Sequence, residues 1–377
     1  MDCKYFGICG GCQLGQFTYD EQLEHKLSIQ KKRFEEFNIN SFDIIKSDDG
    51  SFRNRAEFRV FKNYDEDNNR TLSYAMYDID KKLLCLDSCS IVSNQIKSLM
   101  PQLLNQLQQV EILNNKVFSV EFLNALDGDM LVTLIYHKKL DEEWNEEAKK
   151  IEKKLDIKII GRSRKQKVVL SDDYINEEIE VLNQTYKYQY LEGGFTQPNQ
   201  KVNEKMIEWV INNSKHSDDL CELYCGGGNF TLPLSQYFNK VLATEVSKTS
   251  INSAKNNCTL NKITNIKFIR LAAEEFVEAQ NKLREFRRLK QEDVDLDNYN
   301  FSTIFVDPPR AGLDDTTRKL VGEFDQIIYI SCNPETLHRD LQTILQTHEI
   351  KRFAFFDQFA FSTHIESGVI LEKKESV

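Results

Sequence analysis

The sequence lacks several features that would point to particular classes of protein. No uncharged apolar run approaches membrane-spanning length, and Met1-Asp2-Cys3-Lys4 lacks the charged and then apolar pattern of a signal peptide. There is no internal repeat and no low-complexity tract. With 49 Lys and Arg against 59 Asp and Glu, the net charge of −10 argues against indiscriminate nucleic-acid binding. We therefore expect a cytoplasmic globular protein with neither a membrane nor DNA as partner.

The chain has 377 residues, of which 40% are hydrophobic and 29% charged, so two domains are expected. The acidic total still allows a local basic face. Runs of this kind are more often solvated charge than a binding surface. Three clusters are candidates: Arg53, Arg55 and Arg59; Arg162, Arg164, Lys165 and Lys167; and Arg284, Arg287, Arg288 and Lys290.

Nine cysteines without a secretion signal indicate reduced thiols with chemical roles rather than a disulfide scaffold. They form two groups, the first in the first quarter of the chain and the second in its last half. The members are Cys3, Cys9, Cys12, Cys85 and Cys89, and then Cys221, Cys225, Cys258 and Cys332.

The first half of the chain predicts a mixed α+β domain. An apolar stripe of Leu23, Leu27, Ile29, Phe34 and Phe37 predicts a helix over residues 18–37. We expect a cysteine-containing segment with this helix over residues 1–45 and an α+β domain over 46–185. The expected elements of that domain are strands at 56–61, 72–77, 117–123, 130–136, 157–160 and 168–170, a hairpin loop at 64–70, and helices after Cys89 and at 141–155.

The second half of the chain predicts a doubly wound, Rossmann-like α/β domain over residues 186–377, entered through a loop at 193–199. Short apolar strands at 220–224, 240–244, 266–270, 302–306 and 326–330 alternate with helices, which is typical of a mostly parallel sheet. Ligands of such sheets bind at the carboxyl ends of the strands.

A glycine-rich turn follows the first of these strands, at Tyr224 to Asn229. Glycine allows a backbone to approach a ligand closely. Thr231 stands where a dinucleotide fingerprint needs its last glycine, so NAD is disfavoured. Glu245, at the end of the next strand, is placed to accept hydrogen bonds from ribose hydroxyls. A nucleoside cofactor without a pyrophosphate fits better, and S-adenosylmethionine is the common one.

Cys332 follows the strand at 326–330. Asn333 is a helix-capping residue and Pro334 suits the first helical position, so a helix should start here. A thiol at a helix N-terminus has its thiolate stabilised, so we expect a pKa below the usual value of about 8.5. This setting favours a nucleophile over a buried structural cysteine, whereas Cys225 and Cys258 are expected to be packing residues.

A nucleophile of this kind is what methylation of uracil at C5 requires. Addition of a thiolate at C6 turns the ring into an enolate whose C5 can accept a methyl group, and a base must then remove the C5 proton. Glu366, in an apolar strand context, is the expected base, with His364 as an alternative. Asp307-Pro308-Pro309 is similar to a motif of amino-methyltransferases, but Arg310 replaces the aromatic residue that stacks on the base, which disfavours N-methylation.

Several motifs together resemble the family of RNA (uracil-C5)-methyltransferases, from about Phe52 to the C-terminus. They are Phe195-Thr196-Gln197-Pro198-Asn199, Glu222-Leu223-Tyr224-Cys225-Gly226, Asp307-Pro308-Pro309-Arg310, Ser331-Cys332-Asn333-Pro334 and the segment around Glu366. Tyr136 to Asp141 and Arg284-Glu285-Phe286 resemble the bacterial tRNA branch, which makes 5-methyluridine in the T-loop.

This resemblance implies roles for particular residues. Cys332 would be the nucleophile and Glu366 the proton acceptor. Arg53, Arg55 and Phe118 would touch RNA, with the domain before residue 186 as the RNA-binding part and the uridine flipped into the pocket. The methyl donor S-adenosylmethionine would be held by Gln197, Tyr224, Gly226, Asn229, Glu245 and Asp307.

The N-terminal cysteines depart from the tRNA branch. Cys3, Cys9, Cys12 and Cys89 resemble the iron–sulfur ligand set of ribosomal-RNA relatives, which implies a structural [4Fe–4S] cluster. Tetrahedral zinc, or no metal, are the alternatives, and Cys85 could substitute for Cys89.

Three functions therefore stay open at this point. The first is uracil-C5 methylation of tRNA, acting on the T-arm and on other RNAs with a T-like loop. The second is the same chemistry on 23S ribosomal RNA, which the cysteines favour. The third is an RNA-binding or folding factor with a vestigial site, which the intact Cys332 and Glu366 disfavour.

Overall fold

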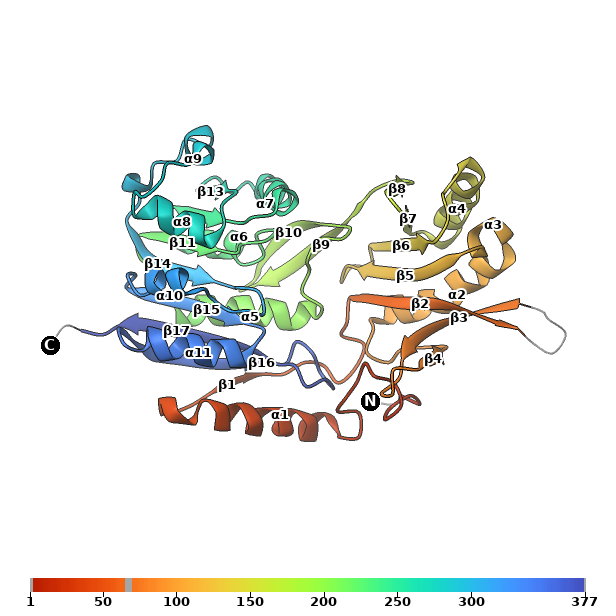
Figure 1. The fold of residues 1–377 in the computed structure, drawn as a ribbon, viewed down its shortest axis with the longest axis horizontal. Helices are drawn as coiled ribbons and strands as arrows, with labels where there is room; N and C mark the ends of the chain where they lie inside the picture. Colours follow the sequence, from red (N-terminus) through yellow and green to blue (C-terminus); the bar gives the residue numbers. More distant parts are fainter. Residues whose placement is uncertain (1–2, 65–69, 376–377) are drawn as a thin grey trace.

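The structure, a computed structural model, describes residues 3–64 and 70–375. These residues form two lobes that lie side by side (Figure 1). The central lobe holds a seven-stranded sheet and the C-terminal lobe an eight-stranded one. None of the helices in the described ranges is both long and apolar enough to cross a membrane.

The central lobe confirms the expected mixed α+β architecture. Its strands follow the order β4-β3-β2-β5-β6-β7-β8, and all neighbours are antiparallel except β6 and β7. Helices α2 and α4 share one apolar core with one face of the sheet. The bounds are β2 (Arg55–Tyr64), β3 (Arg70–Tyr77), β4 (Leu83–Leu86), α2 (Asn94–Gln109), α3 (Glu111–Asn114), β5 (Val117–Asn124), β6 (Met130–Tyr136), α4 (Glu142–Leu155), β7 (Lys158–Ser163) and β8 (Gln166–Val169). The hairpin loop expected at 64–70 lies mostly outside the described residues.

The C-terminal lobe confirms the doubly wound fold. Its strand order is β1-β16-β17-β15-β14-β11-β12-β13, and every neighbour is parallel except β17, which runs against β15 and β16. The five strands expected from the sequence are present within one or two residues. The bounds are β1 (Asp43–Ile45), β11 (Asp219–Leu223), β12 (Val241–Thr244), β13 (Ile266–Ile269), β14 (Phe301–Val306), β15 (Gln326–Ser331), β16 (His348–Phe356) and β17 (Glu366–Lys373).

Helices cover both faces of this sheet because its strands are apolar on both sides. One core packs α5 (Gln200–Asn213), α6 (Thr231–Leu234) and α7 (Lys248–Leu260) against the sheet. The opposite core packs α1 (Tyr19–Arg33), α8 (Ala273–Gln280), α10 (Asp315–Val321) and α11 (Pro334–Ile344), with the short α9 (Arg287–Gln291) beside it. The chain leaves β11 toward β12 and later returns to β14 on the other side of β11. This reversal is where a ligand crevice is expected.

A hairpin that the sequence reasoning missed joins the two lobes. It consists of β9 (Tyr174–Val181) and β10 (Gln184–Leu191), which pair along their whole length. Ile179, Val181, Tyr186 and Tyr188 from this hairpin are buried in the same core as α5 and α7. The boundary expected between residues 185 and 186 therefore falls inside β10.

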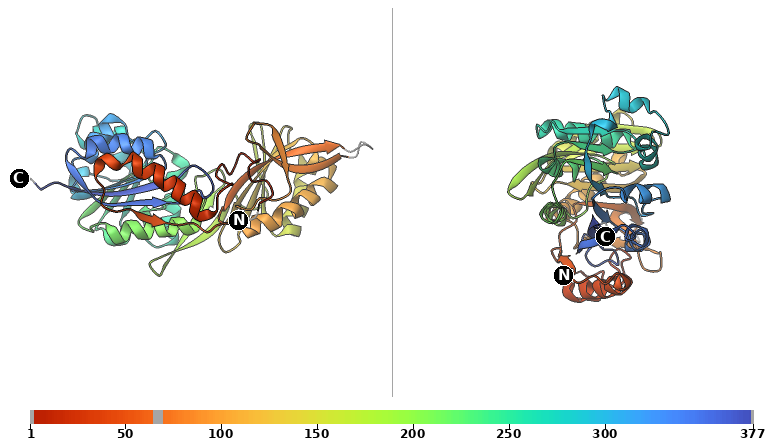
Figure 2. Two further views of the ribbon diagram at one scale, coloured as in Figure 1. Left: turned by 90° about the horizontal axis from the view of Figure 1, so that it is seen from below. Right: turned by 90° about the vertical axis from the view of Figure 1, so that its left-hand side faces the viewer.

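The predicted N-terminal helix is present as α1, followed by a 3-10 turn at Glu35–Phe37. Thr18 and Glu21 form its capping box. Figure 2 shows α1 lying along the C-terminal lobe. Its buried face differs from the predicted stripe, because Ile29 is exposed while Gln22, Lys26 and Gln30 are buried. Gln22 and Lys26 find polar partners in the connection between β16 and β17, whereas Gln30 accepts a hydrogen bond from Arg33 at 3.1 Å.

Candidate active site

The first of two neighbouring cavities lies at the carboxyl ends of β11 and β14, and we call it cavity A. Its lining includes five of the six residues expected to hold the cofactor, namely Gln197, Tyr224, Gly226, Asn229 and Asp307. These residues come from three separate parts of the chain, and the parallel sheet brings them to one edge.

The glycine-rich turn shapes one wall of cavity A. Tyr224, Gly226 and Gly228 have left-handed φ values of 63°, 55° and 87°. A Cβ on Gly228 would also lie 2.6 Å from Cδ1 of Leu232. The third glycine is therefore required both by its backbone conformation and by close packing against the following helix.

Glu245, the sixth residue expected to hold the cofactor, lies beside this turn at the end of β12. Its carboxylate accepts hydrogen bonds from the backbone N–H of Gly226, at 3.3 Å, and of Ser247, at 2.8 Å. These two bonds fix the carboxylate next to cavity A, although the side chain is not part of the cavity lining.

Cavity A has polar atoms that a ligand could satisfy. The side-chain oxygens Oγ1 of Thr196 and Oε1 of Gln197 are buried and have no hydrogen-bond partner within the described part of the chain. Buried acceptors without partners are costly, so a bound molecule with hydrogen-bond donors would stabilise this arrangement. Together with the glycine turn and Glu245, these atoms fit a nucleoside-type ligand.

The second cavity, cavity B, contains Cys332 and lies beyond the carboxyl end of β15. Its lining also includes Arg310, Thr363 and His364. Asn333 caps α11 as predicted, because its side chain accepts a hydrogen bond from the backbone N–H of Glu335 at 3.1 Å. Asn333 also donates to the carbonyl of Arg310 at 2.9 Å, which ties the loop after β14 to the start of α11.

Two carboxyl groups, those of Glu366 and Asp307, interact with the thiol of Cys332. Glu366, the first residue of β17, is 4% exposed, and burial with the nearby charge of Asp307 raises its pKa to about 8. Burial also raises the pKa of Asp307, which lines cavity A, to about 7. The charges of Glu366 and Asp307 both act on the thiol of Cys332. Cys332, Glu366 and Asp307 thus interact electrostatically with one another, with Asp307 in the lining of cavity A and Cys332 in that of cavity B.

The expected lowering of the Cys332 pKa is wrong. Burial first, and then the charges of Glu366 and Asp307, raise the pKa of this thiol to about 11. Arg310 and a backbone hydrogen bond act in the opposite direction but do not outweigh them. The sequence showed the helix start but not the two carboxylates that the fold brings next to the sulfur.

The residues expected to touch RNA lie in two places. Arg53 and Arg55 stand at the junction of the lobes, where Arg53 Nε donates to the carbonyl of Arg55 and an Nη of Arg55 donates to the carbonyl of Gly194. Phe118 lies further away, on the sheet face opposite the helices of the central lobe. The fold does not bring these three residues together.

Phe118 is part of a row of side chains from three adjacent strands, β3, β2 and β5, and from His137, which directly follows β6. Its ring stacks on His137 with centroids 4.2 Å apart. The guanidinium of Arg59 lies 4.8 Å from the Phe118 ring centroid and 5.0 Å from that of Tyr77. A row of aromatic rings with an arginine is a surface on which unpaired bases can stack.

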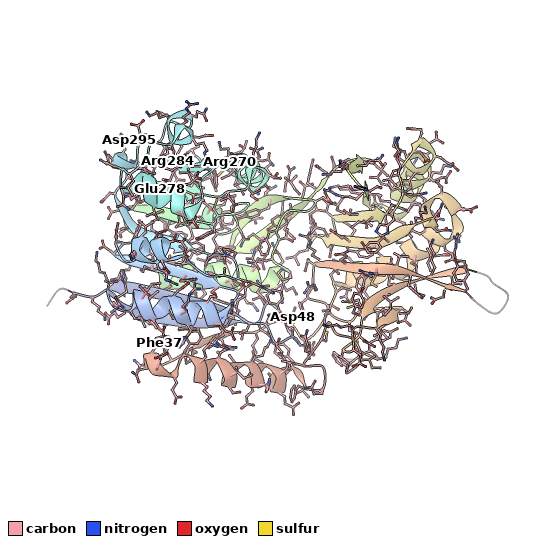
Figure 3. The ribbon with its side chains drawn as sticks, viewed as in Figure 1. Phe37, Asp48, Arg270, Glu278, Arg284 and Asp295 are labelled. Atoms are coloured by element: carbon pink, nitrogen blue, oxygen red, sulfur yellow. The ribbon has the colours of Figure 1, made fainter. Side chains whose placement is uncertain are left out.

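The third basic cluster is largely neutralised. Arg284 and Glu278 lie near each other on the C-terminal lobe in Figure 3, with a separation of 3.8 Å between charged atoms. Arg288 pairs with Glu275 at 2.8 Å, and Lys290 pairs with Glu285 at 2.5 Å. This cluster is therefore mainly solvated charge.

The N-terminal cysteines lie around a third, small cavity. Its lining includes Cys3, Cys9, Cys12 and Cys89 but not Cys85, which lies on β4. Burial and the three neighbouring thiols together raise the pKa of Cys12. As they stand, however, no three His, Cys, Asp or Glu side chains in residues 3–64 and 70–375 form a group that could hold a metal ion.

Comparison with known proteins decides the family. The model of the tRNA (uracil-5-)-methyltransferase family matches residues 18–374. The chain is 61% identical over 374 residues to a tRNA/tmRNA (uracil-C(5))-methyltransferase of Aliarcobacter butzleri, covering 99% of each chain. It is 48% identical to the enzyme of the same name from Nitratiruptor sp., covering 99% of this chain and 100% of the relative. The chain belongs to the tRNA (uracil-5-)-methyltransferase family.

A solved structure shares the fold along almost the whole chain. The tRNA (uracil-54, C5)-methyltransferase of Pyrococcus abyssi, in complex with S-adenosyl-L-homocysteine, matches with a TM-score of 0.72 at 19% identity, covering 97% of this chain and 86% of that one. The protein is thus a methyltransferase of this family with S-adenosylmethionine as its methyl donor. The glycine turn and the unpartnered oxygens of cavity A fit that donor.

Sequence reasoning missed the contribution of α1 to cavity B. Gln30 and Arg33 line this cavity, and Arg33 pairs with Glu335 at 3.1 Å. A signal was present, because Gln22, Lys26 and Gln30 repeat every four residues along the helix. Polar residues at this spacing are usually solvent-facing, and only the fold shows that they are buried.

Proposed function

We propose that this enzyme methylates C5 of a uridine in the T-loop of tRNA through a covalent adduct with Cys332. The observation that supports the proposal is that the thiol of Cys332, which lines cavity B, interacts with the carboxyl groups of the buried Glu366 and of Asp307, which lines cavity A. A methyl donor in cavity A and a uracil ring in cavity B would then react beside these three groups.

The reaction begins at the sulfur of Cys332. Its thiolate adds to C6 of the ring, and the electrons of the C5–C6 double bond move onto the ring as an enolate. C5 then bonds to the methyl group that bound S-adenosylmethionine would supply, and the bond from that methyl group to the sulfonium sulfur breaks to leave S-adenosylhomocysteine. Glu366 then takes the proton from C5, the double bond re-forms, and the bond from C6 to sulfur breaks to return the thiolate. The product is 5-methyluridine.

The residues of cavity A hold the donor. We assign Gln197, Tyr224, Gly226 and Asn229 to contacts with it, and Asp307 to the side that faces the reaction. Glu245 is placed beside the glycine turn, as is usual for a carboxylate that binds ribose hydroxyls in this kind of fold. The buried, unpartnered Oε1 of Gln197 supports its assignment.

We assign Glu366 rather than His364 as the base. A carboxyl with a pKa raised to about 8 is a stronger base than an ordinary glutamate. His364 lines cavity B, and burial, Arg310 and Lys26 lower its pKa, so it would be neutral at pH 7. His364 is therefore the alternative acceptor of the C5 proton, and the variants described below distinguish it from Glu366.

The central lobe binds the RNA in this proposal. Flipping a uridine into cavity B requires the rest of the loop to be held, and the row of Tyr77, Arg59, Phe118 and His137 offers rings on which unpaired bases can stack. Arg53 and Arg55 hold the junction next to which the loop would enter. Because the curated relatives are named for tRNA and tmRNA, we include tmRNA as a substrate with a T-like loop.

The four N-terminal cysteines bind a [4Fe–4S] cluster in this proposal. The fold brings Cys3, Cys9, Cys12 and Cys89 to one cavity although Cys89 is distant in sequence, and it leaves Cys85 outside. Four thiolates are the usual ligand set of such a cluster. The cluster would be structural, since the methylation needs no electron.

Labelled S-adenosylmethionine and separate pools of tRNA, tmRNA and 23S ribosomal RNA test the substrate. Label in tRNA and tmRNA, mapped to a T-loop uridine, is expected. Label confined to ribosomal RNA would overturn the assignment of tRNA as the substrate. No label in any pool would favour an RNA-binding factor without methyltransferase activity.

Three variants test the mechanism. Cys332→Ala should abolish both methylation and any adduct that survives denaturation. Glu366→Gln should accumulate that adduct because the C5 proton stays in place. If His364→Ala traps the adduct and Glu366→Gln turns over normally, the base is His364.

A further inference from the structure

The segment that connects β16 to β17 forms part of the wall of cavity B. It runs over residues 357–365, contributes Thr363, His364 and Ile365 to the cavity, and leads directly into Glu366. It contains neither a helix nor a strand. It has a turn of its own, in which the backbone N–H of Ser362 donates to the carbonyl of Phe359 at 3.2 Å, and side chains from elsewhere in the chain contact it as well.

Lys26 of α1 contacts this segment at three points. Its side chain is 2% exposed and forms an ion pair with the fully buried Asp357, the first residue of the segment. The same ammonium donates hydrogen bonds to the carbonyl of Phe359 at 3.2 Å and to that of His364 at 3.3 Å. One buried cation thus joins the beginning, the middle and the end of the segment.

Gln22, one turn earlier on α1, strengthens these contacts. Its Nε2 donates to Asp357 at 3.1 Å, and its Oε1 accepts from the backbone N–H of Phe361 at 3.2 Å. Phe361 has a left-handed φ of 61°, which a non-glycine residue adopts only when its surroundings hold it there. The backbone N–H of Leu14 also donates to the carbonyl of Phe361, at 2.9 Å.

The chemistry of these contacts suits positioning better than stabilisation. Replacing a buried ion pair by well-packed apolar side chains is often neutral or favourable for folding. Three directional bonds from one ammonium do something that apolar packing does not, because they specify a single arrangement of the backbone that they contact. The backbone concerned is the wall of the cavity that holds Cys332.

We propose that Lys26 is a positioning residue that fixes residues 357–365 so that Glu366 reaches the C5 proton of the Cys332-bound uridine. This inference rests on the proposed function of Glu366. A base that has moved by about 1 Å loses much of its effect, so elimination should slow while addition of the thiolate continues.

The test compares Lys26→Met combined with Asp357→Asn, which strands no buried charge, with the wild type and with Glu366→Gln. In the double variant we expect kcat to fall at least about tenfold, within the roughly 10²- to 10⁴-fold that a positioned base contributes. The KM for tRNA should change little, and a larger fraction of the enzyme should sit in the denaturation-resistant, methylated adduct. Gln22→Leu, which leaves no charge unpaired, should shift the adduct fraction in the same direction and serves if the double variant does not fold.

Lys46→Met is the matched control. It removes an exposed ion pair between Lys46, which follows β1, and Asp20 of α1, with 2.8 Å between the charged atoms. This variant should behave as wild type. Wild-type kcat and adduct fraction in both the double variant and Gln22→Leu would overturn the inference, as would a parallel loss of adduct and turnover. If Glu366→Gln traps an adduct and the Lys26 variants do not, only the role of Lys26 fails. If Glu366→Gln traps none, the assignment of the base fails as well.

Discussion

The ionisation of Glu366 gives a quantitative prediction for the last chemical step. Because its pKa is raised to about 8, the carboxylate form that accepts the C5 proton is lost as the pH falls through that value. With a pKa of about 8, the ionised fraction falls from about 90% at pH 9 to about 1% at pH 6. The rate at which the methylated adduct is resolved should therefore fall about 90-fold over this range, if the carboxylate is the base.

The assay separates this step from the attack of Cys332, which has its own pH dependence. Enzyme, methyl donor and tRNA with tritium at uridine C5 are mixed briefly at pH 9, where the thiol attacks fastest, and are then jumped to pH 6, 7 or 8 or kept at pH 9. Loss of the denaturation-resistant complex and release of tritium into water are followed together. Glu349→Gln, at an exposed carboxylate paired with Lys351, is the control and should keep the wild-type profile. A resolution rate that is flat from pH 6 to pH 9 would refute the reasoning, as would a wild-type profile in Glu366→Gln.

Three further predictions concern other parts of the molecule. Addition of the Cys332 thiol, whose pKa is raised to about 11, should accelerate steadily from pH 7 to pH 9. Arg310→Met should slow this addition, because it removes a positive charge that favours the thiolate, and an adduct-formation rate independent of pH would contradict the reasoning. Glu222 is 1% exposed with a pKa raised to about 8, so its stabilising contribution below pH 4.5 is lost as the pH rises through 8. Glu222→Gln should therefore raise the free energy of unfolding at pH 9 relative to pH 5, by up to roughly 4 kcal/mol at about 1.4 kcal/mol per pH unit, and equal melting shifts at both pH values would count against it. Anaerobically purified protein should contain about four irons and absorb broadly near 400 nm, and Cys12→Ser should lose both while Cys85→Ser keeps them; zinc or no metal in the wild type would remove the cluster.

The sequence by itself determined the class of fold and the kind of reaction, which is S-adenosylmethionine-dependent methylation of uracil at C5. Strand-like runs followed by Tyr224, Asp307 and Cys332 predicted a parallel sheet with its ligands at one edge, because parallel strands end on the same side. The cap at Asn333 and the start of α11 were also local properties, since they depend on a few consecutive residues. The periodicity of residues 18–37 predicted α1 but not its partners.

The tertiary structure decided everything that depends on residues distant in sequence. Whether a thiol is acidic is set by its neighbours, and the charges of Glu366 and Asp307 reversed the expectation based on the helix start alone. The burial of Lys26 follows from its pairing with Asp357, more than 300 residues later, which no helical pattern can show. Electrostatics and burial are sums over surrounding atoms, so they become known only once the chain has folded.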